Sequence, residues 1–470
     1  MKSALSRKNL WDRAPASVRS VAGRVLGMLP PKYLIGQRFR KQLAFLNDAQ
    51  WWSADRAAAY QLAELRRICT IAASKTGYYW GVFAAAGVDP STLTFDSFRR
   101  LPTLNADLVR AHIDDMCAEP VNSSGVDYIT TGGTGGKPLR FYINASRSQI
   151  EYAYLVASWQ RAGFSLGTPL AVFRGRVVRA GADGVHHEFD RALRQHNYSG
   201  FHLSDDELRR ALAHVSGIGP CFLHAYPSSA ATLARFIRRS GLEAPRNLLG
   251  ILLESENVYP EQRLMIEETF GRKCFSSYGM TEKVVSAAEC ERSASYHVWP
   301  TYGYFELLDA DGRAVTTPGE IGEITGTSFI NHVVPFVRYR TGDFATYVGA
   351  RCDACGREHP IIADIRGHNT QELLVAADGS VIPWSALNMH DDTFDRVQRF
   401  QFFQDTPGRA VLRVLPSPSF TDADLSTIRD RMARKIDGRL EFTVQRVENI
   451  PLSGRGKSIF VDQRIAAPRT

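Results

Sequence analysis

Cysteine is scarce and long apolar runs are missing in this 470-residue chain, and each shortage excludes a class of protein. The seven cysteines are odd in number and scattered, which argues against a disulfide framework and leaves metal binding or burial as their uses. No apolar stretch approaches the roughly 18 residues that a membrane-spanning helix needs. The N-terminus lacks the apolar core and cleavage site of a signal peptide, so we expect a cytoplasmic protein.

The chain also lacks a long run of basic residues, although its formal net charge is +8. Such a charge suits anionic small molecules, a membrane surface or nucleic acid. Because the basic residues do not alternate with aromatic residues in an RNA-reading motif, we expect no nucleic-acid partner. The basic and apolar residues 18–42 are compatible with peripheral membrane contact, but packing against their own domain is the preferred interpretation.

A Walker P-loop is absent as well, but a glycine-rich loop joins two strand-like segments at 128–130 and 139–143. In its sequence, TTGGTGGKP, Thr131 occupies the first glycine position of the Walker pattern and Pro138 follows Lys137. Backbone N–H groups around glycines, threonine hydroxyls and one ammonium group suit a phosphate. An ordinary hairpin tip has the same composition, so the loop alone leaves both interpretations open.

Strands and helices alternate in the middle of the chain. Ser204 and Glu207 have the spacing of a capping box that begins a helix. Strands are predicted over 221–226, 248–254 and 273–279, and helices over 228–240 and 260–270. This alternation predicts an α/β fold with a parallel sheet. Polar stretches follow the strands directly, at 226–229, 255–257 and 278–282, and at the carboxyl ends of parallel strands they would line one pocket.

The two ends of the chain differ from this middle part. Residues 53–73 predict a helix with Ser53 as its cap, and the first hundred residues look mainly helical. Strand and turn patterns dominate after residue 300, and a smaller α+β unit begins near residue 370. We therefore divide the chain into a helical part at 1–110, a core at 111–366 and a small C-terminal lid at 367–470.

The motifs TGGTGGKP, YGMTE, RYRTGD and LSGRGKS occur in the order found in adenylate-forming enzymes. From about residue 101 to its C-terminus the chain resembles that superfamily, and within it the branch of phenylacetate-CoA ligase and the CapK-like polysaccharide-biosynthesis proteins. The resemblance implies a large N-terminal domain with parallel-containing sheets and helices, followed by a mobile C-terminal lid. It also implies ATP-binding residues, which are Thr131, Gly132, Gly133, Thr134, Gly135, Gly136, Lys137, Ser255, Glu256, Tyr278, Gly279 and Asp343.

Individual roles follow from the same resemblance. Tyr278 would stack on adenine, Thr281 would contact the α-phosphate and Glu282 would hold Mg²⁺, roles that suit an aromatic face, a small hydroxyl and a hard anionic oxygen. Asp343 would accept hydrogen bonds from the ribose, and Arg340 would lie beside the phosphates. Lys457 on the lid would stabilise negative charge during adenylation.

The implied reaction begins when a carboxylate attacks the α-phosphate of ATP and releases pyrophosphate. The acyl group then passes to a thiol such as CoA, or, as an alternative, to an amine on a sugar or peptide. The acid would lie against His224, Ala225, Tyr226 and Pro227, just beyond a strand end. The hinge is atypical, because His368 and Gln371 stand where the family has arginine and an acidic residue. A degenerate nucleotide-binding scaffold is therefore a third interpretation.

The sequence also contains a pattern of cysteines and a histidine that is typical of metal sites. Cys352 and Cys355 have the two-residue spacing of a zinc knuckle, and Cys290 with His297 would complete a Cys₃His set. Relatives in this branch carry cysteines at similar places, whereas a redox or merely buried pair is the alternative. Four protein ligands leave no open position, so the zinc would be structural. His359 is the rival fourth ligand.

Overall fold

The computed structural model describes residues 31–131, 139–176, 178, 180–181, 184–200, 204–366, 373–383, 387, 389, 392–394, 396–416, 418, 420–451 and 461–465. Six helices open the described chain: α3 (Pro31–Ile35), α4 (Gln37–Ala49), α5 (Ala54–Lys75), α6 (Gly77–Ala86), α7 (Phe95–Arg99) and α8 (Ala106–His112). The helix expected over 53–73 is α5, and the Ser53 hydroxyl accepts a hydrogen bond from the Arg56 N–H at 3.3 Å. No helix in these described ranges combines the length and apolarity needed to cross a bilayer.

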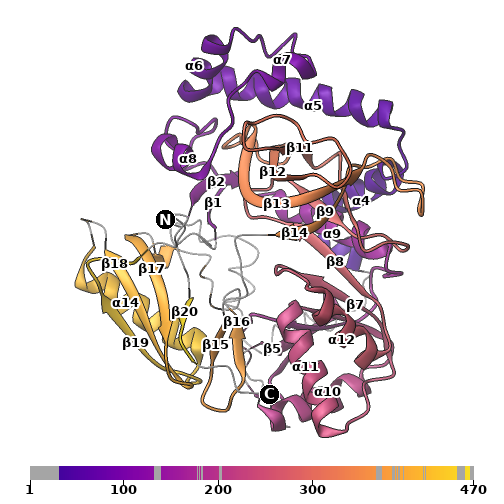
Figure 1. Ribbon diagram of the computed structural model, residues 1–470, viewed down its shortest axis with the longest axis vertical. Helices are drawn as coiled ribbons and strands as arrows, with labels where there is room; N and C mark the ends of the chain where they lie inside the picture. The colour runs from indigo at the N-terminus through magenta and orange to yellow at the C-terminus, as the bar shows by residue number, and fades with distance from the viewer. Residues whose placement is uncertain are drawn as a thin grey trace.

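One 12-stranded sheet forms the centre of the described chain (Figure 1). Its strands in spatial order are β11 (Gly303–Leu308), β12 (Ile321–Ser328), β13 (Tyr339–Gly349), β14 (Ile361–Arg366), β10 (Tyr296–Val298), β9 (Ser286–Ala288), β8 (Cys274–Gly279), β7 (Leu248–Glu254), β6 (Cys221–Ala225), β3 (Leu170–Arg174), β5 (Gln195–Ser199) and β4 (His187–Asp190). The run β8-β7-β6-β3-β5 is parallel and the other pairings are antiparallel. The α/β fold with a parallel-containing sheet is thus confirmed.

The helix α9 (Arg147–Gln160) precedes the first parallel strand, β3, and the helices between later parallel strands are α10 (Asp205–Gly217), α11 (Pro227–Ser240) and α12 (Pro260–Phe270). Figure 1 shows α10, α11 and α12 beside the β5–β7 end of the sheet, whereas α5, α6 and α7 lie beyond β11 at its other end. The capping box is present, because the Ser204 N–H donates to Glu207 at 3.1 Å. α11 and α12 end at Gly241 and Gly271, whose φ values of 63° and 60° lie in the left-handed region that glycine adopts without strain.

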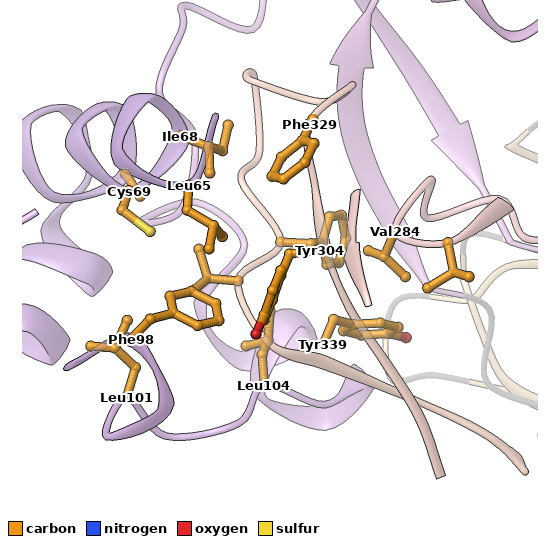
Figure 2. Close-up of a cluster of buried hydrophobic side chains, with 14 of the residues drawn as sticks. Leu65, Ile68, Cys69, Phe98, Leu101, Leu104, Val284, Tyr304, Phe329 and Tyr339 are labelled. Atoms are coloured by element: carbon orange, nitrogen blue, oxygen red, sulfur yellow. The ribbon is translucent and has the colours of Figure 1, made fainter. Parts of the chain in front are cut away.

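A shared core joins the N-terminal helices to the antiparallel strands. Leu65 and Phe98 from α5 and α7 pack with Tyr304 and Tyr339 from β11 and β13, as Figure 2 shows. Leu104 extends this contact by exchanging backbone hydrogen bonds with the residues on either side of Tyr339. The helical N-terminal part therefore packs as one body with the sheet that carries the motifs at 278–282 and 338–343.

The described part of the basic N-terminal segment also packs inward. Phe39 on α4 is fully buried, and its ring lies 5.6 Å from that of Tyr152 on α9. This contact agrees with the preferred interpretation that the segment packs against its own domain.

Smaller sheets complete the structure. The hairpin of β1 (Val126–Thr130) and β2 (Arg140–Asn144) matches the two strands expected around the glycine-rich loop. A second hairpin joins β15 (Leu373–Val375) and β16 (Val381–Pro383). The C-terminal sheet contains β17 (Val397–Gln404), β18 (Arg409–Pro416), β19 (Glu441–Arg446) and β20 (Val461–Gln463), with the short η1 (Asp392–Phe394) and the helix α14 (Asp422–Ile436) beside it.

The C-terminal sheet has a hydrophobic core of its own, centred on Phe400, Leu412 and Met432. It lies to one side of the central sheet in Figure 1, as the α+β unit expected from residue 370. A separate core is what an independently moving unit requires. The domain boundaries and the mobility of this unit remain predictions.

Candidate active site

Three ionisable side chains meet at the carboxyl ends of the parallel strands β3, β6 and β7. Glu254 lies between the Arg174 guanidinium, 3.1 Å away, and the His224 imidazole, 3.2 Å away. Burial opposes ionisation of Glu254, but His224 and Arg174 together hold the pKa of this carboxyl below its ordinary value. Burial also lowers the pKa of His224. The edge of the sheet therefore holds an ionised carboxylate with a cationic partner.

Arg174 was not predicted from the sequence as a site residue. It ends the strand sequence LAVFR, whose other four residues are buried, so an arginine directly after an apolar strand was the available signal. Its guanidinium donates to the Ser255 hydroxyl at 2.8 Å and lies 5.2 Å from the centre of the Tyr226 ring. Arg174 thus connects the polar stretches that follow β6 and β7.

The residues predicted to bind the acid lie where β6 meets α11. His224 is 4% exposed and its ring contacts that of Trp159 edge-on, with the ring centres 4.9 Å apart. Ala225, Tyr226 and Pro227 are also buried. Contact of these four residues with an acid stays a prediction.

Ser255 and Glu256 lie on the adjacent strand end. Ser255 has a φ of 69°, which turns the chain sharply after β7. The Glu256 carboxylate accepts hydrogen bonds from the backbone N–H of Ser228 at 2.9 Å and from its hydroxyl at 3.0 Å. The Glu256 carboxylate, which follows β7, thus lies against the first turn of α11 and complements the positive end of that helix. The stretches at 226–229 and 255–257 therefore meet, as expected from parallel strands.

The motifs YGMTE and RYRTGD also meet, although about sixty residues separate them in the sequence. The Tyr278 hydroxyl donates a hydrogen bond to the Asp343 carboxylate at 2.8 Å. Burial and the neighbouring Asp343 carboxylate raise the pKa of Tyr278, so its hydroxyl stays protonated and remains a donor. The contact places the predicted adenine-binding ring beside the predicted ribose-binding carboxylate.

A turn in β13 fixes the position of Asp343. The Asp343 N–H donates to the Thr341 hydroxyl at 3.0 Å, and that hydroxyl donates to the Ile324 carbonyl at 2.8 Å. Gly342 has a φ of 78°, a conformation that a side chain would strain. Its N–H donates to Glu323 at 2.8 Å, so the neighbouring strand β12 anchors the turn.

Glu282 provides a second carboxylate in this region. It accepts a hydrogen bond from the Tyr339 hydroxyl at 3.2 Å. Burial is the main cause that raises the pKa of Glu282, and the negative charge of Asp343 raises it further. Carboxylate oxygens that repel each other suit a hard cation such as Mg²⁺, which would neutralise both. Thr281 directly precedes Glu282 in the turn after β8, and Gly279 is the last residue of that strand.

Arg340 has a protein partner in this structure. Its guanidinium donates to the Glu323 carboxylate from Nε at 2.7 Å and from Nη2 at 2.6 Å. The sequence did not indicate Glu323 as a site residue, because it lies within the strand β12. Glu323 comes close to Arg340 only when β12 pairs with β13 in the folded sheet. Contact of Arg340 with phosphates stays a prediction. It would require the guanidinium to bind the Glu323 carboxylate and a phosphate at the same time.

Several predicted residues lie outside the described part of the chain. These are Gly132, Gly133, Thr134, Gly135, Gly136, Lys137 and Lys457, together with His368 and Gln371 of the expected hinge. Thr131 is described at the end of the β1–β2 hairpin. Its N–H donates to the Leu139 carbonyl at 2.8 Å, and its hydroxyl accepts from the Leu139 N–H at 2.9 Å. The hairpin ladder therefore continues to the edge of the glycine-rich loop.

A second cluster gathers the four predicted zinc ligands. The donor atoms of Cys290, His297, Cys352 and Cys355 all lie within 4.8 Å of one another. Pairing of β10 with β9 and β14 brings His297 beside Cys290, and a tight turn at Gly356 holds the two remaining cysteines together. The His297 Nδ1 atom lies 3.1 Å from the Ser295 carbonyl, which leaves Nε2 for a metal.

The separation of these donor atoms fits tetrahedral zinc. Nε2 of His297 lies 3.4 Å from Sγ of Cys355. Zinc bonds of about 2.1 Å to nitrogen and 2.3 Å to sulfur at the tetrahedral angle would place the two atoms roughly 3.6 Å apart. His359 is not in this group among the described residues, and its ring centre lies 6.3 Å from that of His297.

Known proteins share the fold of this chain. No family model matches the sequence. The fold is that of adenylate-forming ligases: a structure of 2-hydroxyisobutyryl-CoA ligase in complex with 2-HIB-AMP and CoA superposes with a TM-score of 0.57 at 20% identity, covering 88% of this chain and 91% of that one.

Two curated proteins are similar to this chain in sequence. The chain is 28% identical over 310 residues to phenylacetate-coenzyme A ligase of Pseudomonas putida, covering 64% of this chain and 69% of the relative. It is 22% identical over 394 residues to protein CapK of Staphylococcus aureus, covering 83% and 85%. The chain is therefore similar in sequence to phenylacetate-CoA ligase and to CapK, and it has the fold of adenylate-forming ligases.

Proposed function

We propose that the protein uses ATP and Mg²⁺ to activate a small carboxylic acid as an acyl-adenylate and then transfers the acyl group to the thiol of CoA. The observation that carries the proposal is the hydrogen bond between Tyr278 and Asp343, with Glu282 nearby. It joins two nucleotide motifs at one edge of a sheet whose fold is shared with CoA ligases. A cytoplasmic location, where ATP and CoA occur, agrees with this activity.

The chemistry divides into two displacements. A carboxylate oxygen of the acid attacks the α-phosphorus of ATP, the bond to the bridging oxygen breaks, and pyrophosphate leaves. The thiolate sulfur of CoA then attacks the acyl carbon, and AMP leaves with the oxygen that joined it to the acyl group. Both steps depend mainly on positioning and on neutralising negative charge.

The chain's own residues supply this positioning. Asp343, held by the Thr341–Gly342 turn, accepts hydrogen bonds from the ribose, and the Tyr278 ring packs against adenine. Glu282 would hold Mg²⁺, which would screen the negative charge of the phosphates. Thr281 and the glycine-rich loop with Lys137 contact phosphate oxygens, and Arg340 adds positive charge. Lys457 on the lid completes the charge neutralisation when residues 367–470 rotate toward the sheet.

The acid occupies the region beyond β6, near His224 and Tyr226. Arg174 supports this assignment, because its guanidinium lies over Tyr226 and provides positive charge for an anionic substrate. Glu254 partly neutralises that charge, which favours a carboxylate whose own charge is consumed during adenylation over a substrate with a second acidic group.

Product analysis tests the function and its acceptor. The protein is incubated with ATP, Mg²⁺ and a panel of aryl, fatty, amino and sugar acids, and released pyrophosphate is measured. Mass spectrometry of the products with and without CoA then identifies the acceptor. An acyl-CoA supports the proposal, and an amide formed only with added amines indicates the amide synthetase. No pyrophosphate with any acid would favour the nucleotide-binding scaffold.

We also propose that Cys290, His297, Cys352 and Cys355 bind one structural zinc ion. Elemental analysis of protein purified without chelator is expected to give at least about one zinc per chain. A Cys352→Ser variant should contain about one zinc less than the wild type, whereas Cys117→Ser, at a cysteine outside the cluster, should contain as much as the wild type. Wild-type protein free of zinc, or a Cys352→Ser variant with the full zinc content of the wild type, would refute this assignment.

A further inference from the structure

Three histidines outside the proposed active site and the cysteine cluster lie close together. His187 on β4, His196 on β5 and His214 on α10 each offer one ring nitrogen, and these nitrogens all lie within 4.8 Å of one another. Each side chain is half-buried, so an ion from solvent can reach the group. The cluster lies at the free edge of the 12-stranded sheet, where β4 is the last strand.

Strand pairing explains how the histidines meet. In the antiparallel pair of β4 and β5, His187 is opposite Tyr198 and Phe189 is opposite His196. Alternation along both strands puts all four side chains on one face of the sheet. His214 reaches the same face from the last turn of α10, and its ring centre lies 4.3 Å from that of His187.

The distances suit a shared metal ion. Nε2 of His187 lies 3.0 Å from Nδ1 of His196. Two imidazole nitrogens bound at 2.0–2.1 Å to one ion lie about 2.9 Å apart at a right angle and about 3.4 Å apart at the tetrahedral angle. A hydrogen bond between two rings has the same length, but it does not explain why the ring nitrogen of His214 lies within 4.8 Å of both.

A second interaction positions the third histidine. The Tyr198 hydroxyl lies 2.7 Å from Nδ1 of His214. A histidine that donates Nδ1–H to such an oxygen keeps its lone pair on Nε2, which is the arrangement that commonly orients metal-binding histidines. Tyr198 is itself 2% exposed and stacks on Phe173, so its hydroxyl is firmly placed.

We propose that His187, His196 and His214 form a second metal site, which binds a divalent transition-metal ion such as Zn²⁺. Three imidazoles without a carboxylate favour zinc, nickel, copper or cobalt over magnesium or calcium. Three protein ligands leave a coordination position for water or another small ligand. The ion would fasten the β4–β5 edge hairpin to α10, beside the strands that carry Arg174 and His224.

Cobalt titration tests this site separately from the cysteine cluster. Metal-free protein is titrated with Co²⁺ at pH 7.5 while visible and near-ultraviolet absorption are recorded. Cobalt bound to cysteine gives a sulfur-to-cobalt charge-transfer band, whereas cobalt bound only to histidine gives ligand-field bands without it. We expect one equivalent that shows ligand-field bands alone, whether or not the cysteine cluster binds an ion.

Two variants and a matched control identify the ligands. His196→Gln and His214→Asn should each weaken the nitrogen-only equivalent at least about 10-fold. His186→Gln, which replaces the neighbouring histidine that faces Glu207, should keep it. X-ray absorption of the metal-saturated wild-type protein should show, on average, more than the one imidazole ligand per ion that His297 would supply in the cysteine cluster, which decides the question even if a variant fails to fold. Absence of a nitrogen-only equivalent, or its retention in both folded variants, would overturn the proposal.

Discussion

Replacing Lys457 with alanine is expected to abolish acyl-adenylate formation, with a loss of roughly 10²- to 10³-fold in its rate. Negative charge builds up where the carboxylate meets the α-phosphate, and a lysine ammonium there would be worth several times more than in water. The second step has no such requirement, so a chemically prepared acyl-adenylate should still react with the acceptor. Pyrophosphate exchange measures the first step, and product formation from preformed adenylate measures the second.

The segment that carries Lys457 offers a matched control. Arg455→Ala removes a positive charge two residues away and should leave both steps near the parental rates. An unequal loss in Lys457→Ala fits a lid that presents the lysine for one step and withdraws it for the other. Equal loss of both steps would contradict a role of Lys457 in adenylation alone. Full activity of Lys457→Ala would show that this lysine does not take part in either step.

Asp343→Ala should weaken ATP binding by about 1.5 to 3 kcal/mol, or roughly 10- to 150-fold. The reason is the loss of charged hydrogen bonds to the ribose hydroxyls. Calorimetric titration with ATP and Mg²⁺ measures the change directly. Unchanged affinity would exclude this carboxylate from the nucleotide site.

The variant Tyr278→Phe tests whether the position of the Asp343 carboxylate, and not only its charge, matters for ATP binding. Tyr278→Phe keeps the aromatic ring but removes the hydroxyl that holds Asp343. It should weaken ATP binding by about 0.5 to 1.5 kcal/mol, because the carboxylate keeps its charge and loses one positioning hydrogen bond. If Tyr278→Phe weakened ATP binding as strongly as Asp343→Ala, the retained aromatic ring would contribute nothing to ATP binding. The assignment of Tyr278 to adenine would then fail.

Much of the fold was readable from local signals. The β6–α11–β7–α12–β8 run was predicted because glycines end both helices and the strands are short apolar runs. The joining of β9–β14 to these strands in one sheet was not predicted. Which strands become neighbours is decided by packing between distant segments, such as Leu104 against Tyr339, and no local pattern records that choice.

Some residues of the candidate sites were predicted from the sequence and others were found only in the fold. Tyr278, Glu282 and Asp343 were singled out because they stand in recognisable motifs, and the four predicted zinc ligands because of cysteine spacing. Arg174 and Glu323 escaped notice, since each acquires its position only when strands pair. The three clustered histidines were missed for the same reason: His187, His196 and His214 come from separate elements and share no sequence spacing typical of a metal site.

Oxygen-isotope transfer tests the central claim, that the protein joins a carboxylate to the α-phosphate of ATP. An acid identified by the panel is labelled with ¹⁸O in its carboxylate and is incubated with the protein, ATP, Mg²⁺ and acceptor. If the carboxylate attacks the α-phosphorus, AMP carries one ¹⁸O atom and the released pyrophosphate carries none. Label in inorganic phosphate, with ADP as the other product, would mean attack at the γ-phosphorus and would contradict adenylation.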